Sequence, residues 1–269
     1  MNKNRSGFPV IPVVICAAVL ILIVVLIGAF SSEEPQSPQV LEGVAYLEAL
    51  EAKDPGTIEQ IRREMYQQKL DAQREELLHK LTSGEIDPFS MFQDYVIMGD
   101  SRAVGFWYRN FLDKGRVLAD GGHTIRNIEG QMDQLVSLNP ATIYLCYGLN
   151  DISIGYWKTS EEYTTEYLAM IRMIQEKLPD ATIVVSSILP ARDPAFNRSS
   201  KWRNIPQWSD ALEQVCRENG IVFANCDQLA ADYPNLWDPD GIHFREAFYP
   251  YWASNLVAAT LMKGAENER

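Results

Sequence analysis

The nine residues MGDSRAVGF, at positions 98–106, follow the short apolar run YVI at 95–97. The apolar run predicts a strand, and Gly99 permits the tight turn or close backbone approach with which a chain leaves one. Ser101 then lies just past the strand end, where open α/β sheets place their reactive groups. A plain helix N-cap is the alternative, because Asp and Ser also begin many helices.

The rest of the chain from residue 94 alternates between apolar runs and helical stretches, which favours the α/β interpretation. Continuous apolar strands separated by helices predict a parallel sheet covered on both faces. Right-handed crossovers then place the carboxyl ends of all strands at one edge. A nucleotide-binding function is not favoured, because no Gly-rich phosphate loop is present. The expected strands are 95–99, 116–120, 142–148, 182–188 and 221–226; the expected helices are 102–112, 125–137, 160–178, 205–219 and 246–262.

Several polar residues follow the expected strands at this edge. They are Ser101, a glycine in DGGHT (120–124), Asn150 in GLND, and the pair Asp240 and His243 in WDPDGIHF (237–244). These are the parts of an acyl-transfer site: a nucleophile, oxyanion donors, a base and a group that orients the base. Ser101 would attack, His243 would take its proton, and Asp240 would fix the imidazole tautomer. A polar turn with a chance histidine is the alternative for the last pair.

The same residues resemble the SGNH (GDSL-type) hydrolase family, whose four sequence blocks match in order. The resemblance covers about residues 94–262 and implies a flavodoxin-like three-layer α/β/α fold with five parallel strands in the order 2-1-3-4-5. It also implies an oxyanion hole formed by the backbone N–H groups of Ser101 and Gly122 and the side-chain amide of Asn150. The family's first block often continues into Leu, whereas Arg102 stands here. The four blocks are GDS (99–101), GGHT (121–124), GLND (148–151) and DGIH (240–243).

Aromatic and basic side chains near these blocks are candidates for substrate contact. Such aromatic rings suit stacking on sugar rings or acyl chains, and core packing is the alternative for each of them. The connection 190–208 is long and polar, as binding loops often are. Asp100 is expected to brace its loop rather than to act as a catalyst, and Asp151 is expected to be either a helix cap or a loop brace. The candidate substrate contacts are Trp107, Arg192, Arg203 and Trp237.

No metal and no cofactor are expected, because none of the three histidines has a zinc-like spacing to acidic or cysteine partners. The net charge of −12 argues against a nucleic-acid partner, which would need clustered Lys and Arg. Cys216 and Cys226 would pair if the domain lies outside the cell, and the sequence leaves this open.

The N-terminal region predicts an uncleaved membrane anchor, with a cleaved signal peptide as the alternative. Residues 9–30 carry no charge and would span roughly 33 Å as a helix, enough for a bilayer core. Lys3 and Arg5 precede this run, which predicts a cytoplasmic N-terminus and an extracytoplasmic catalytic domain. The expected organisation is a cytoplasmic segment (1–8), a transmembrane anchor (9–30), a linker (31–39), a helical stalk (40–90) and a hydrolase domain (91–269).

The sequence therefore predicts a membrane-anchored serine esterase that removes a small acyl group, such as acetyl, from a carbohydrate ester. An O-acyltransferase that passes the acyl group from Ser101 to a sugar hydroxyl is the first alternative. A catalytically idle glycan-binding or assembly module is the second. A lipase or thioesterase stays open as well, because the sequence does not reveal the depth of the pocket.

Overall fold

The computed structural model describes residues 45–46 and 55–267, and it contains the expected parallel sheet. Five strands pair in the order β2-β1-β3-β4-β5, and every neighbouring pair is parallel. This confirms the strand order that the resemblance implies. Each strand is close to its expected position, although several are shorter. Their bounds are β1 Tyr95–Gly99, β2 Val117–Ala119, β3 Thr142–Cys146, β4 Thr182–Ser186 and β5 Val222–Ala224.

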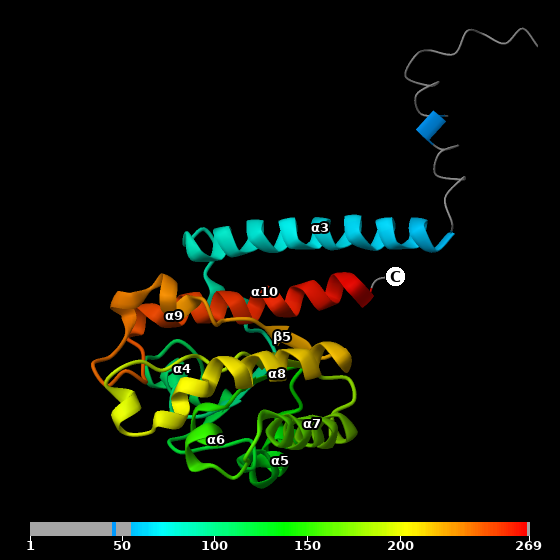
Figure 1. Ribbon diagram of the computed structural model, residues 1–269. Coiled ribbons are helices and arrows are strands. Elements are labelled where there is room, and N and C mark those ends of the chain that lie inside the picture. Colours follow the sequence, from blue (N-terminus) through cyan, green and yellow to red (C-terminus); the bar gives the residue numbers. More distant parts are fainter. Residues whose placement is uncertain (1–44, 47–54, 268–269) are drawn as a thin grey trace, which may run out of the picture. The chain divides into compact units, whose positions relative to one another are not determined.

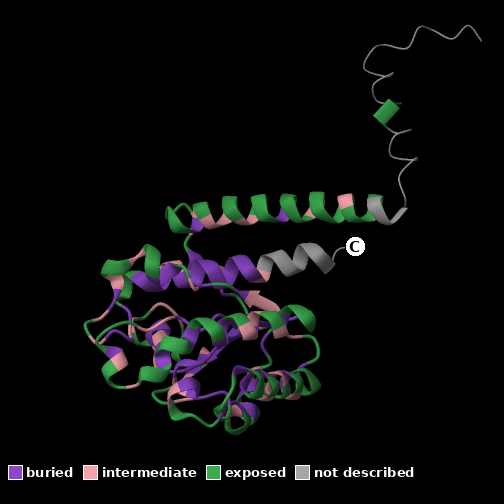
Figure 2. Ribbon diagram, viewed as in Figure 1, coloured by how far each residue is buried: buried purple, intermediate pink, exposed green. Residues whose placement is uncertain are grey.

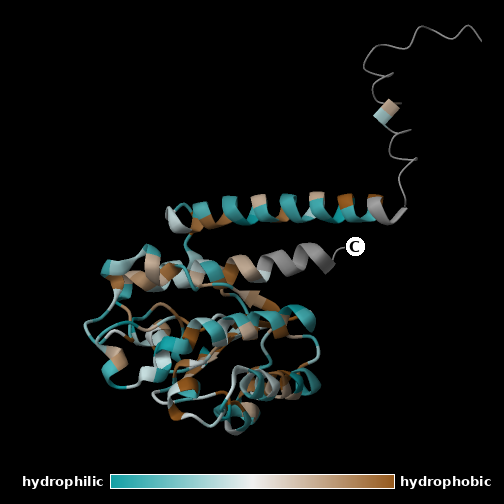
Figure 3. Cartoon of the chain, in the orientation of Figure 1, coloured by the Kyte–Doolittle hydropathy of each residue, from teal (hydrophilic) through white to brown (hydrophobic). Residues whose placement is uncertain are grey.

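Helices cover both faces of the sheet (Figure 1). One face packs against α5 (Asn127–Leu138), α7 (Ser160–Lys177) and α8 (Ile205–Glu218). The other packs against α10 (Tyr249–Asn267) and the short α4 (Gly105–Tyr108). The buried residues gather in the strands and along α10 (Figure 2). In contrast, α8 presents a largely hydrophilic surface to solvent (Figure 3).

Short helices occupy the connections between these elements. The α-helical ones are α6 (Leu149–Ile154) and α9 (Leu229–Asp232). The 3-10 helices are η1 Pro88–Met91, η2 Lys114–Arg116, η3 Ala195–Asn197, η4 Ser200–Asn204, η5 Pro234–Leu236 and η6 Glu246–Phe248. The expected helix over 102–112 shrinks to α4, because the chain makes a series of tight turns after β1 before it becomes helical.

The compact unit that contains the sheet begins at Gln67, within the long helix α3 (Pro55–Thr82). Leu81 belongs to the segment expected to form the stalk, yet it is buried and joins the core beside α10. Leu77 packs against the same cluster. The part of α3 that starts at Gln67 therefore contributes to the folded unit, and removal of residues up to 66 spares these contacts.

Two expectations concern the membrane and the cysteines. The predicted anchor, 9–30, lies outside the described residues. Within the described ranges, no helix combines the length and the apolar character needed to cross a bilayer. Cys216 and Cys226 are both free, and they lie in the two separate core clusters on opposite faces of the sheet.

Candidate active site

Ser101 lies in the turn that follows β1, and Gly99 is what allows the turn to form there. A Cβ atom at residue 99 would lie 2.6 Å from the carbonyl oxygen of Cys146 on β3. Only glycine permits so close an approach. Asp100 then donates its backbone N–H to the same carbonyl at 3.2 Å. The turn is thereby pinned to the centre of the sheet, with Ser101 at its carboxyl edge.

Asp240 and His243 form a compact pair within one turn. The Nδ1 atom of His243 is 2.6 Å from one carboxylate oxygen of Asp240. The other carboxylate oxygen accepts the backbone N–H groups of Ile242 and His243, both at 2.9 Å. Partial burial opposes ionisation of Asp240, but these bonds outweigh it and lower the pKa of its carboxyl. Asp240 is thus held as a carboxylate, which can only accept hydrogen bonds.

The pair reaches Ser101 through the other ring nitrogen. The Nε2 atom of His243 is 2.9 Å from the Oγ atom of Ser101. Because Asp240 accepts a hydrogen bond from Nδ1, the neutral imidazole has its lone pair on Nε2 and can accept the serine hydroxyl proton. This arrangement can make a serine hydroxyl nucleophilic.

The turn that carries His243 is fixed from both sides. Trp237 and Phe244 form an antiparallel bridge across its base, and their rings pack 4.6 Å apart between centroids. The backbone N–H of Arg192 donates to the carbonyl of Gly241 at 2.9 Å, which ties the turn to the loop after β4. The base therefore has a defined place relative to the sheet.

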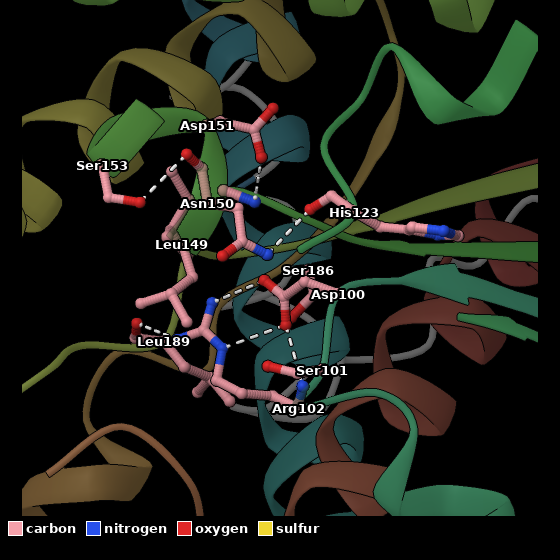
Figure 4. A network of polar contacts seen from close by, with 12 residues as sticks. Asp100, Ser101, Arg102, His123, Leu149, Asn150, Asp151, Ser153, Ser186 and Leu189 are labelled. Carbon is pink, nitrogen blue, oxygen red and sulfur yellow. Dashed lines mark hydrogen bonds and ion pairs between the residues drawn. The ribbon is translucent and has the colours of Figure 1, made fainter. Parts of the chain in front are cut away.

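Three candidate oxyanion donors follow three neighbouring strands at this edge: Ser101 after β1, Gly122 after β2, and Asn150 on α6 after β3. Among the described residues, no hydrogen bond engages the backbone N–H of Ser101 or Gly122, whereas Gly121 donates its N–H to Asp120. Gly122 has a φ of +78°, a conformation that favours glycine. One N–H of the Asn150 amide donates to the carbonyl of His123 at 2.9 Å, and the His123 ring points away from it (Figure 4). The other N–H of that amide forms no hydrogen bond within the part of the chain that the structure describes.

Asp151 braces the two loops that carry these donors. Its carboxyl oxygens accept the backbone N–H groups of Ile125 and Gly148, at 2.9 and 3.0 Å. Burial raises the pKa of this carboxyl to about 7, although both hydrogen bonds lower it. The expectation of a bracing role is confirmed by these contacts.

Arg102 has a structural role that the sequence did not reveal. Its side chain is 3% exposed and forms an ion pair with Asp100, 3.2 Å from Nη2 to Oδ2. Nη1 donates to the carbonyl of Leu189 in the loop after β4, and the backbone carbonyl of Arg102 accepts the hydroxyl of Tyr249 (Figure 4 shows the first of these bonds). The sequence gives one indication of this role, which is the position of Arg102 directly before the apolar run AVGF. Because an arginine is usually exposed, this position does not predict that Arg102 is buried.

The sequence from residue 90 to residue 250 matches the GDSL-like lipase/acylhydrolase family, which is more than half of the chain. The chain belongs to this family. It is therefore an ester hydrolase of the acylhydrolase type, and the four blocks identified above all lie within the matched region. No curated protein matches the chain.

Solved structures of GDSL-like proteins share this fold. A protein from Parabacteroides merdae described as a GDSL-like lipase is 20% identical, with a TM-score of 0.53; the match covers 63% of this chain and 97% of that one. A GDSL-like lipase from Bacteroides thetaiotaomicron is 17% identical, with a TM-score of 0.51, over 64% of this chain and 88% of that one. A Bacteroides fragilis protein described as an acylhydrolase is 18% identical, with a TM-score of 0.52, over 64% and 86%.

The four substrate-contact candidates of this GDSL-like acylhydrolase differ in their surroundings. Trp237 is 4% exposed and donates its indole N–H to the carbonyl of Ala230, so the expectation of substrate contact is corrected: it is a core residue beneath the His243 turn. Arg192 lies over the Trp237 ring at 4.8 Å and braces the same turn. Arg203 is exposed and stacks on Phe196 at 4.1 Å. Among the described residues, no hydrogen bond, ion pair or ring contact joins Arg203 or Trp107 to Ser101.

The described part of this GDSL-like acylhydrolase contains no group of three or more His, Cys, Asp or Glu side chains that could hold a metal ion. The charges nearest to Ser101 in the sequence, Asp100 and Arg102, neutralise each other.

Replacing Asp151 with alanine is expected to destabilise the domain by about 2–4 kcal/mol. The change would leave two buried backbone N–H groups without acceptors, and each such loss costs about 1–3 kcal/mol. Urea unfolding monitored by circular dichroism measures the difference. Asp133→Ala, an exposed acidic residue on α5, is the control and should change stability by less than about 0.5 kcal/mol. Equal stability of the two variants would contradict the bracing role.

The raised pKa of Asp151 also predicts a pH dependence of stability. In the unfolded chain this carboxyl ionises near 3.8, and in the folded chain near 7. Between these values the folded state binds the extra proton, so the free energy of unfolding should fall as pH rises from about 4 to 7. In Asp151→Ala the free energy of unfolding should not show this decrease between about pH 4 and 7. Parallel pH profiles for the two proteins would show that burial does not raise this pKa.

Proposed function

We propose that this acylhydrolase is anchored in a membrane by residues 9–30 and removes a small acyl group, such as acetyl, from a carbohydrate ester on the outer side. The observation that carries the catalytic part is the continuous chain from Ser101 Oγ through His243 to Asp240, at 2.9 and 2.6 Å. Both distances are within hydrogen-bond reach for catalytic groups, and nucleophile, base and orienting group are present together.

In the first half of the reaction, the Ser101 oxygen attacks the acyl carbonyl while His243 Nε2 takes the hydroxyl proton. The carbonyl π bond breaks, and its oxygen becomes an oxyanion. The N–H groups of Ser101, Gly122 and Asn150 would donate to that oxygen as its charge develops. The resulting imidazolium is stabilised by the Asp240 carboxylate.

In the second half, the tetrahedral centre collapses and the bond to the sugar oxygen breaks. His243 returns its proton to that oxygen, so the sugar leaves with a free hydroxyl and Ser101 holds the acyl group. Water then attacks the acyl carbon of the acyl-serine while His243 takes a proton from it. The bond between the Ser101 oxygen and the acyl carbon breaks, His243 returns the proton to Ser101, and the carboxylic acid is released. If a sugar hydroxyl replaced the water, the same steps would give acyl transfer.

The membrane part of the proposal is supported by the uncharged run at 9–30 and by the basic residues Lys3 and Arg5 before it. An anchored domain outside the cell would meet surface glycans at high local concentration. Fractionation of cells that express the full chain, followed by protease treatment of intact cells, tests this part. A protein that stays in the soluble fraction, or that resists protease until lysis, would contradict it.

The reaction is tested with p-nitrophenyl esters of increasing chain length and with O-acetylated oligosaccharides. We expect the highest kcat/KM for the acetyl ester and measurable release of acetate from the oligosaccharides. A maximum at long acyl chains would favour a lipase instead. Transfer of acetyl to added sugar faster than to water would favour the acyltransferase. Absence of turnover on every ester would favour a binding module.

Asn150→Ala is expected to lower kcat by about 10²–10³ and to leave KM nearly unchanged, because the amide would act on the oxyanion rather than on bound substrate. Steady-state kinetics on p-nitrophenyl acetate measures both constants. Ser153→Ala, on the same short helix, is the control, since its hydroxyl only donates to the carbonyl of Asn150. If Asn150→Ala has the same kcat as the control variant, Asn150 is not part of the oxyanion hole.

A further inference from the structure

A cavity of about 540 Å³ lies beside the helix that carries Asn150. It is bounded by the end of α6, the start of α7, and the segment in which η4 passes into α8. Cavities of 300–1,000 Å³ are the usual size of small-molecule sites in proteins. None of the steps described above uses this cavity.

The cavity adjoins the helix that carries Asn150, at the far end of that helix. Asn150 is the second residue of α6, and the lining residues Ile152 and Gly155 are two and five residues further on. At about 1.5 Å of rise and 100° of rotation per residue, Ile152 lies about 3 Å along the helix from Asn150 and on its opposite face. The cavity lies at the carboxyl edge of the sheet, because α6 follows β3 and η4 follows β4.

The walls of the cavity are joined to α6 by hydrogen bonds. The indole N–H of Trp202 on η4 donates to the carbonyl of Leu149 at 2.8 Å. The Lys201 amine, which lines the cavity, donates to the carbonyl of Ser153 at 3.3 Å. The position of α6, and with it that of Asn150, is therefore tied to the cavity wall.

The lining combines an apolar part with polar groups of both kinds. Trp157 and Trp208, which are 6% and 7% exposed, contribute a small apolar area to the wall, and Lys158 and Lys201 supply donors. The amides of Asn204 and Gln207 donate and accept, and all four of these polar residues are exposed. Sugar rings present apolar C–H faces together with hydroxyl groups that donate and accept, so this lining matches their chemistry.

We infer that the cavity between α6, α7 and α8 is a binding subsite for the glycan part of the ester, at the same edge of the sheet as Ser101. The inference rests on the proposed function and names the part of the chain that would select a carbohydrate substrate. A sugar in this subsite would leave another ring of the same oligosaccharide to present its ester to the nucleophile. Short acyl esters without a sugar would not use the subsite.

The test uses the double variant Lys158→Ala/Gln207→Ala in the full chain. Its matched control is Lys177→Ala/Gln214→Ala, which changes the same residue types at the end of α7 and on α8, away from the cavity. Kinetics are measured on p-nitrophenyl acetate and on O-acetylated xylotetraose and O-acetylated chitotetraose. We expect both variants to match the unchanged enzyme on p-nitrophenyl acetate. On at least one tetrasaccharide ester, only the cavity variant should lose about tenfold in kcat/KM, mainly through KM.

Binding is measured separately, so that the subsite and the proposed reaction can fail independently. Unacetylated xylotetraose and chitotetraose are titrated into Ser101→Ala protein and into Ser101→Ala combined with the cavity substitutions, with tryptophan fluorescence as the signal. A saturable change that the cavity substitutions weaken supports the subsite. No saturable change with either sugar, or equal affinity in both proteins, overturns it. If sugars bind but their acetyl esters are not cleaved, the subsite stands and the proposed glycan esterase reaction fails.

Discussion

Replacing Ser101 with alanine is expected to lower kcat/KM on p-nitrophenyl acetate by about 10⁴–10⁶, with protein stability nearly unchanged. His243→Ala should cause a loss of the same order, and the double variant should lose little more. The effects of substituting two residues that act in the same step do not add, because the first substitution already abolishes the step that the second would impair. The 2.9 Å contact between Ser101 Oγ and His243 Nε2 is the geometric reason to treat them as one unit.

A sulfonyl fluoride provides an independent readout of this unit. It should label Ser101 in the unchanged enzyme, and the labelling should be slow in His243→Ala, where no base takes the serine proton. Mass spectrometry of the digested protein identifies the labelled residue. If Ser101→Ala retains the turnover of the unchanged enzyme, another residue is the nucleophile, and the turn after β1 serves only the fold.

Asp240→Asn is expected to lower kcat by about 10⁴ while the fold is kept. The substitution retains the size of the side chain but removes its charge and lets an N–H face the ring. His243 would then be stabilised with its proton on Nε2, where it cannot accept the serine proton. The imidazolium formed during the reaction would also lose its counter-charge. Stopped assays with high enzyme concentration measure so large a loss.

Asp238→Asn is the matched control for this prediction, because Asp238 lies in the same turn. Its carboxylate is 3.9 Å from the Arg109 guanidinium and has no contact with the His243 ring among the described residues. It should keep kcat within a few-fold of the unchanged enzyme. Similar losses in the two variants would mean that the turn, rather than the Asp240 carboxylate, limits the reaction.

The main features of the fold and the Ser101–His243–Asp240 arrangement could be predicted because both depend on short-range patterns. Apolar strands alternating with helices define a parallel sheet, and its topology brings the strand ends to one edge. Asp240 and His243 lie three residues apart in one turn, a spacing that the sequence displays directly. Gly122 could be preferred over Gly121 from the family blocks, and the bond from Gly121 to Asp120 agrees with that choice.

The features that the sequence did not predict depend on contacts between distant segments. Arg102 is buried because Asp100 and the carbonyl of Leu189, 87 residues further on, satisfy its guanidinium. From the sequence, Trp237 is an aromatic residue in a loop and therefore a candidate for substrate contact. Its packing on Phe244 shows that it belongs to the core. The shortening of the 102–112 helix follows from the turns that pin residues 100–104 to the sheet. None of these contacts has a periodic signature in the chain.

The His243–Asp240 contact and the His243–Ser101 contact also differ in the length of chain that each must close. The first spans three residues, and the second spans 142. Because the entropy lost on closing a loop grows with its length, the short contact can form in a partly folded chain, whereas the long one needs the C-terminal segment docked beside β1. After dilution from denaturant, the time course with which enzyme activity returns would therefore report when that segment docks. Backbone signals such as circular dichroism would report earlier stages of the same process.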